Sequence, residues 1–180
     1  DKGNLRLRGT NNPNGTSTGF NESTNSLDYS YIQFGTNAEV ACTGDIRTLL
    51  DWDNYTTVNT ENARFNYLFN KCSVLTSAPE LPATSLAYNC YHCMFLGCTN
   101  LKSAPKLPAP TLTTGCYFGM LSMCTNLKTA PELPAKALAY QCYDSMFSGC
   151  TNLKSAELSI EFLYLGCCGS MFYNCTNLSS

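Results

Sequence analysis

The cysteines of this chain recur at a fixed interval, which constrains the fold more than any other feature of the sequence. We call cysteines at equivalent positions of successive units a column. The first column has a constant step between its members, except that the last step is shorter by one position; its members are Cys72, Cys98, Cys124, Cys150 and Cys175. A second column follows the first at a constant offset, except in the fourth unit, which lacks the first proline of the others: Cys90, Cys116, Cys142 and Cys167. A period of about 26 residues is typical of proteins built from stacked structural repeats.

Apolar side chains keep the same period in the unit C-T-N-L-K-S-A-P-E-L-P, followed by L-x-x-x-C-Y-x-x-M-F. One unit cannot bury these groups alone, whereas stacked copies bury them against each other. The alternation in T-N-L-K-S-A predicts a short strand, which Pro79, Pro105 and Pro131 end because proline cannot donate a ladder hydrogen bond. The spacing of leucine, cysteine and methionine predicts a helical or 3₁₀ turn on the opposite face.

We therefore expect an α/β repeat solenoid over residues 64–180, with a leucine-rich-repeat stack of short parallel strands and short helices or 3₁₀ turns opposite them. It begins with a half repeat, in which Phe65, Leu68 and Phe69 fill the positions of Tyr91, Met94 and Phe95. Four units of about 26 residues and the start of a fifth follow. Leu158 and Leu163 are expected in the core of the fourth unit.

The unit C-x-x-L-x-x-A-x-x-L-P…L…M-F-x-x-C resembles the BspA-like class of bacterial leucine-rich repeats. The resemblance covers residues 64–180 and recurs four times, although the unit here is longer and carries alanine where that class prefers isoleucine. Stretches of the segment before the repeats, such as LRLRGT and IRTLLDWDN, resemble the N-terminal regions of gut-bacterial surface proteins built from these repeats. The resemblance implies an extracellular or cell-surface protein with a role in adhesion or host interaction.

Residues 1–63 are predicted to form a β-rich N-terminal cap that covers the open end of the first repeat. Apolar and basic residues alternate over 5–8, and residues 29–42 suggest strand, turn and strand. Asp45 is a suitable N-cap for a short helix. The Gly, Asn, Ser and Thr of residues 9–26 indicate a flexible loop.

The twelve cysteines leave two interpretations open. Stacked cysteines can pack as small buried thiols, or they can form disulfides between equivalent positions of neighbouring units. Cys90 and Cys93 also have C-x-x-C spacing, but Gly or Ser stands at the position of Cys93 in the other units, so we expect Cys93 to face outward. With no second such pair, and with His92 expected at the surface, the sequence predicts no metal and no cofactor.

No catalytic constellation is present in the sequence. A Gly-rich phosphate loop, H-E-x-x-H and G-x-S-x-G are all missing, and Asp51 and Asp53 are interpreted as solvated or capping acids. Charged residues make up 13% of the chain and the net charge is −2, so a nucleic-acid partner is not expected. The apolar runs are too short for insertion into a membrane.

The candidate binding face consists of two rows of charged residues at equivalent positions of successive units. The first row is Lys102, Lys128 and Lys154; the second is Glu80, Lys106, Glu132 and Glu157. Possible aromatic contacts are Tyr88, Tyr140 and Tyr143. These rows are either a solvated surface or the extended contact surface that repeat proteins use.

From these features we expect a non-enzymatic, secreted or cell-surface protein that binds a protein or glycan on another cell or matrix. Two alternatives remain: a structural spacer or display module on a cell or phage particle, and an enzyme with a site in the cap. Residues 175–180 repeat the opening of a unit. We expect this end to be completed by further chain or to self-associate with another copy, burying Leu163, Met171, Phe172 and Leu178.

Overall fold

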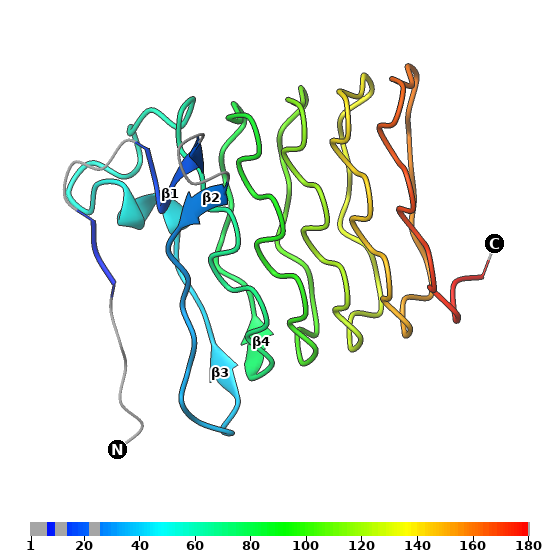
Figure 1. The fold of residues 1–180 in the computed structure, drawn as a ribbon, viewed down its shortest axis with the longest axis horizontal. Helices are drawn as coiled ribbons and strands as arrows, with labels where there is room; N and C mark the ends of the chain where they lie inside the picture. The colour runs from blue at the N-terminus through cyan, green and yellow to red at the C-terminus, as the bar shows by residue number, and fades with distance from the viewer. Residues whose placement is uncertain (1–6, 10–13, 22–25, 180) are drawn as a thin grey trace.

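A computed structural model describes residues 7–9, 14–21 and 26–179 (Figure 1). Its regular elements are few and short: β1 (Ser17–Asn21), β2 (Ser26–Tyr29), β3 (Val40–Ala41), the 3₁₀ helix η1 (Ile46–Leu49) and β4 (Leu75–Ser77). Strands β1 and β2 pair antiparallel, and β3 and β4 pair parallel. The remainder of the described chain is turns and irregular coil.

The predicted α/β solenoid of strands and helices is therefore wrong. The described residues contain no α-helix, and their parallel pairing is limited to β3 with β4 and to isolated bridges such as Thr129 with Ser155. A proline ends the equivalent stretch in three units, at Pro79, Pro105 and Pro131, where it cannot donate a ladder hydrogen bond. Proline is only part of the reason, because β4 forms before Pro79, while the fourth unit lacks this proline and has only isolated bridges. The chain is mostly irregular coil, whose successive lengths lie side by side (Figure 1).

Regular hydrogen bonds nevertheless join each length of coil to the next along the segment where helical turns were predicted. Alternate amides of residues 89–97 donate to carbonyls at equivalent places in the next length of coil, in the pairs Tyr91 to Cys116, Cys93 to Phe118, Phe95 to Met120 and Gly97 to Ser122. The amides between them donate three residues back, as Met94 does to Tyr91 at 3.1 Å. Each segment is thus a series of tight turns, bonded both internally and to its neighbour.

Left-handed residues at every fourth position are incompatible with the predicted helical turns. In one unit these are Asn89, Cys93 and Gly97, with φ of 54°, 51° and 75°. A right-handed helix cannot contain such residues, because each of its residues needs a negative φ of roughly −60°. The spacing of four that suggested a helix marks the repeat of these turns instead.

The core is a set of columns of equivalent side chains. Tyr91, Tyr117 and Tyr143 stack with ring centroids 5.9 and 6.0 Å apart. Phe65 stacks on Tyr91 at 6.0 Å, as the half repeat predicted. Leu158 and Leu163, which were predicted to be buried, are exposed instead, because no described segment covers the fourth unit on its far side.

The cap differs from its prediction in two places. Part of the expected flexible loop is strand β1, which forms a hairpin with β2. Of the alternating residues 5–8, residues 5 and 6 lie outside the described residues, and residues 7 and 8 are coil. Strand β2 ends at Tyr29, so the expected strand through residue 34 is wrong; that segment runs as coil beside residues 65–69, with the Ile32 amide donating to the Leu68 carbonyl at 2.7 Å. The N-cap at Asp45 is confirmed, since its carboxylate accepts from the Arg47 amide at 2.9 Å.

Candidate binding surface

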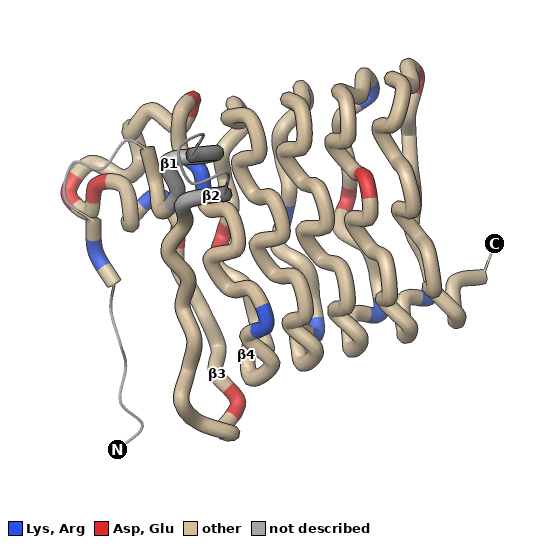
Figure 2. Tube along the Cα trace, viewed as in Figure 1, with Lys and Arg blue, Asp and Glu red and all other residues tan. Residues whose placement is uncertain are grey.

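The three lysines of the first row are exposed at equivalent positions of successive turns. The Lys102 amide donates to the Thr76 carbonyl at 3.2 Å, and the Lys154 amide donates to the Lys128 carbonyl at 2.9 Å. The second bond joins two members of the row directly, and the turns that carry Lys102 and Lys128 are joined by the Asn126 amide, which donates to the Thr99 carbonyl at 3.1 Å. Figure 2 shows basic residues recurring along the lower edge of the molecule, one after another in successive lengths of coil.

The second row is also exposed, and three of its four members are acidic: Glu80, Lys106, Glu132 and Glu157. Its first member is fixed by the cap, because the Glu80 amide donates to the Gly44 carbonyl at 2.8 Å and the Glu80 carbonyl accepts from the Ile46 amide at 3.0 Å. The surface therefore presents a basic row beside a mainly acidic one.

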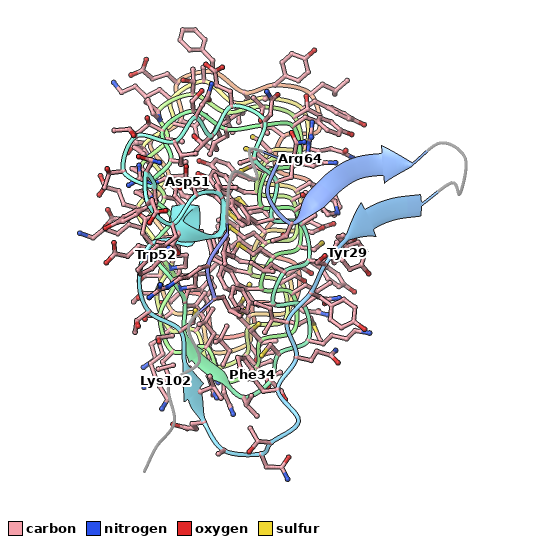
Figure 3. All side chains as sticks on the ribbon, turned by 90° about the vertical axis from the view of Figure 1, so that its left-hand side faces the viewer. Tyr29, Phe34, Asp51, Trp52, Arg64 and Lys102 are labelled. Atoms are coloured by element: carbon pink, nitrogen blue, oxygen red, sulfur yellow. The ribbon has the colours of Figure 1, made fainter. Side chains whose placement is uncertain are left out.

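Two of the three lysines in the first row have no ion pair among the described residues. Lys102, seen beside β3 and β4 in Figure 3, lies 3.2 Å from the Glu39 carboxylate, and both side chains are largely exposed. An exposed pair of this kind contributes little to stability. Lys128 and Lys154 form no ion pair with another described residue. Their charge is available to a partner.

Two of the three predicted aromatic contacts are accessible. Tyr88 and Tyr140 are 52% and 45% exposed. Tyr143 is only 1% exposed, so its prediction as a surface contact is wrong. Its position is that of Tyr91 and Tyr117, whose rings point into the core and stack on one another.

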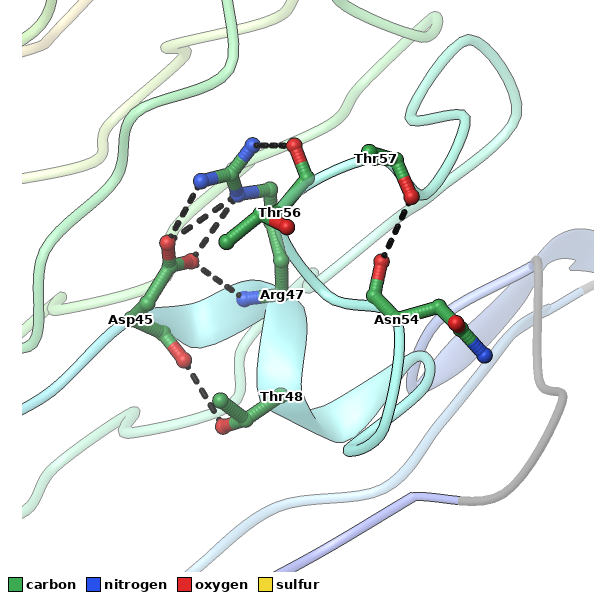
Figure 4. A network of polar contacts seen from close by, with 6 residues as sticks. All are labelled: Asp45, Arg47, Thr48, Asn54, Thr56 and Thr57. Atoms are coloured by element: carbon green, nitrogen blue, oxygen red, sulfur yellow. Dashed lines mark hydrogen bonds and ion pairs between the residues drawn. The ribbon is translucent and has the colours of Figure 1, made fainter.

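The acids of the cap have structural roles. The Asp45 carboxylate accepts from the Arg47 guanidinium at 2.7 Å, and Arg47 also donates to the Thr56 carbonyl at 3.3 Å, which ties η1 to the following loop (Figure 4). The Asp51 carboxylate accepts from the amides of Asp53 and Asn54 at 3.0 and 3.1 Å, and the Asn54 hydrogen bonds lower the pKa of Asp51. Asp51 thus caps a turn, one of the two roles that the sequence suggested.

A pocket of about 420 Å³ lies between the cap segment 33–37 and residues 71–74. Its lining combines polar side chains with Phe34 and Val74. The sequence carried no signal for this pocket, because its two walls are distant in the chain; the pairing of β3 with β4 and the hydrogen bond from Ile32 to Leu68 bring them together. It offers amide, hydroxyl and ammonium groups to a small polar group.

His92 is half-buried and Cys93 is buried, whereas both were predicted to face outward. The His92 ring stacks on Phe118 with centroids 4.7 Å apart, and its Nε2 lies 3.2 Å from the Tyr67 hydroxyl. Burial lowers the pKa of His92 to about 4, and burial raises the pKa of Cys93 to about 11. Within the described part of the chain, no group of three or more His, Cys, Asp or Glu side chains could hold a metal ion.

All twelve cysteines are free thiols in the structure. The first column donates hydrogen bonds to backbone carbonyls of the preceding turn, as Cys124 does to Phe95 at 3.3 Å and Cys150 does to Leu121 at 3.1 Å. Sequence reasoning assigned these cysteines to the core but missed their role as hydrogen-bond donors. Donor and acceptor are separated by more than one repeat in the sequence, so the link is visible only once the turns are in register.

Comparison of the chain with protein-family models, curated proteins and solved structures finds no match. The resemblance of the repeat unit to BspA-like proteins stays a prediction. No helix among the described residues is long and apolar enough to cross a membrane.

Proposed function

We propose that this chain is a non-enzymatic binding module, displayed outside the cell, whose two charged rows contact a protein partner. The observation that carries the proposal is the exposure of Lys102, Lys128 and Lys154 on successive turns in one backbone register. The extracellular location rests on the resemblance of the repeat unit to bacterial surface proteins.

The mixed charge of the surface favours a protein over a polyanion. A nucleic acid or a sulfated glycan would gain from the lysine row but would be repelled by Glu80, Glu132 and Glu157. A protein can present acidic groups to one row and basic groups to the other. Complementary charges of this kind raise the association rate and select the partner.

The first experiment probes a protein and glycan array with the purified chain, and the ligand found there is used to compare variants. The test variant carries Lys128→Glu and Lys154→Glu, because neither lysine has an ion pair to lose with a described residue. The matched control is Lys136→Glu, an exposed lysine outside both rows and outside the pocket lining, whose exposed ion pair with Glu161 contributes little to stability.

We expect the double variant to lose at least about tenfold in affinity, mostly through slower association, and the control to bind like the parent. Binding to glycans alone would contradict a protein partner. Unchanged protein binding by the double variant would show that the lysine row is not the contact surface.

We also propose self-association through the last turns of the described chain. Leu163 and Leu165 are 75% and 86% exposed, whereas Leu138, which is equivalent to Leu163 in the preceding turn, is buried by the coil beside it. A second copy could cover these leucines as a neighbouring turn does. Sedimentation velocity on the parent and on Leu165→Asp should show a concentration-dependent dimer that the substitution removes; a parent that stays monomeric at all concentrations contradicts it.

A further inference from the structure

Two adjacent thiols lie in contact near the far end of the molecule. The sulfur atoms of Cys167 and Cys168 are 3.3 Å apart, and this is the one hydrogen bond between two thiols among the described residues. Cys168 stands where Tyr91, Tyr117 and Tyr143 stand in the other turns. The pair therefore replaces a core aromatic with a second thiol.

The pair can be reached from solvent. Cys168 is half-buried, and the residues on either side of the pair, Gly166 and Gly169, are exposed. Cys167 is buried but touches Cys168 directly. A small reagent that reaches Cys168 thus also finds the second sulfur.

Neither an ordinary disulfide nor a zinc site suits this pair. The Cα atoms of neighbouring residues lie about 3.8 Å apart, which is shorter than the roughly 4.4 Å at which disulfides begin to be found, so a bond between the two sulfurs is strained and easily reduced. Structural zinc takes four ligands, and the described residues offer no group of three. The arrangement suits a thiophilic centre that needs only two sulfur ligands in close proximity.

We propose that Cys167 and Cys168 form a binding site for a trivalent organoarsenical, with the two sulfurs as its paired ligands. Such a centre is pyramidal, keeps its carbon substituent, and holds two sulfurs roughly at a right angle, which brings them close together as they are here. In the reaction with an arsonous acid, two S–H and two As–O bonds break, two As–S bonds form, and two water molecules leave. Arsenic stays trivalent, so no oxidant or reductant is needed.

Among the described residues, no other two thiols lie within hydrogen-bond distance of each other. Cys98, Cys124 and Cys150 are buried, and each donates to a backbone carbonyl of the preceding turn. The second As–S bond at the proposed site forms within one molecule, at a high effective concentration of the second thiol. Burial, followed by the hydrogen bond with Cys167, raises the pKa of Cys168 to about 12, but the condensation starts from neutral thiols and releases only water.

The test titrates the folded, reduced chain with phenylarsonous acid and follows adduct formation by native mass spectrometry and peptide mapping. Cys168→Tyr restores the residue found in the other turns and removes the pair without emptying the site. Cys175→Ser is the control, since it removes another partly exposed thiol that has no thiol neighbour at this distance. Circular dichroism and thermal unfolding confirm that each variant folds.

We expect one arsenic per parent chain, mapped to Cys167 and Cys168, equal binding by Cys175→Ser, and binding weakened about 100-fold or more in Cys168→Tyr. An adduct that maps elsewhere, a parent that binds no arsenic while folded, or a folded Cys168→Tyr that binds like the parent would each overturn the proposal.

Discussion

The thiol of Cys98 donates a hydrogen bond to the backbone carbonyl of Phe69, 3.0 Å away in the preceding turn. That carbonyl also accepts from the Cys72 amide at 3.0 Å, so both of its lone pairs are used. The same link recurs from Cys124 to Phe95, from Cys150 to Leu121 and from Cys175 to Phe147. The cysteine column therefore bonds each turn to its neighbour, in addition to filling the core.

Replacing Cys124 with alanine should lower the free energy of unfolding by about 1–2 kcal/mol. The change removes the thiol bond to the Phe95 carbonyl and leaves a small void, although that carbonyl keeps the Cys98 amide as a partner. Urea unfolding measures the loss. Lys128→Ala, an exposed control, should change the stability by less than about 0.5 kcal/mol. Equal effects of the two substitutions would show that the thiol bond contributes nothing.

The left-handed turns predict opposite effects for two substitutions at equivalent positions. Gly97 has φ of 75° and room for a side chain, since an added Cβ meets nothing closer than 3.6 Å, so Gly97→Ala tests the backbone conformation alone. The substitution should lower the free energy of unfolding by roughly 0.5–1 kcal/mol. This is the cost of a left-handed alanine less the gain from the lower entropy of the unfolded chain once glycine is removed. Met123 occupies the same position one turn later with φ of 60°, and Met123→Gly should stabilise by a similar amount. If thermal unfolding shows that both substitutions stabilise the protein, or that both destabilise it, the left-handed conformations assigned to these two positions are wrong.

His92 makes the stability of the fold depend on pH in the acidic range. Burial lowers its pKa from the usual 6.5 to about 4, so the folded state keeps the ring neutral while the unfolded state takes up a proton below pH 6.5. Stability is therefore full above pH 6.5 and falls as the pH drops from 6.5 to 4, by up to about 3 kcal/mol.

His92→Phe isolates this effect, because His92 is the single histidine of the sequence and Phe118 stands at the equivalent position of the next unit. Urea unfolding at pH 7 and pH 4 should show that the free energy of unfolding falls less between these two pH values in His92→Phe than in the parent. Equal losses would mean that His92 is protonated without cost in the folded state.

The repeat register was predictable from the sequence, because cysteine and aromatic residues recur at positions that the structure stacks, such as Phe65 on Tyr91. The secondary structure was not. The spacing of Cys90, Met94 and Cys98 suits a helical face, but nothing in the side chains reveals that Asn89 and Cys93 adopt left-handed conformations. Periodicity reports which side chains are buried, and several backbone paths can bury the same set.

The candidate surface was predictable only in part. The exposed charged rows follow from the register, since their members alternate with buried leucines. Tyr143 was wrongly predicted to be exposed. Its segment was expected to be a helical turn, whereas it is coil, and the path of the coil turns the Tyr143 ring toward the core. The pocket beside Phe34 and the contact between Cys167 and Cys168 could not be predicted from the sequence, because both depend on how the backbone turns.

Native alkylation tests whether the cysteine columns are buried thiols. Burial raises the pKa of Cys98 to about 12 and that of Cys142 to about 11, so few thiols should react with iodoacetamide at pH 8 while the chain is folded. Denaturation without a reductant should then allow all twelve cysteines to be labelled, as read from the intact mass. Labelling that requires a reductant would show that the columns are disulfide-bonded.

The central claim is the register between turns, because it alone places Lys102, Lys128 and Lys154 in one row. Its most direct test is the NMR detection of scalar couplings across hydrogen bonds in the deuterated protein. The structure predicts couplings from the amide nitrogens of Tyr117, Gly119 and Leu121 to the carbonyl carbons of Cys142, Asp144 and Met146. Couplings from these amides to carbonyls four residues earlier, as in an α-helix, would contradict the register and the charged rows that depend on it.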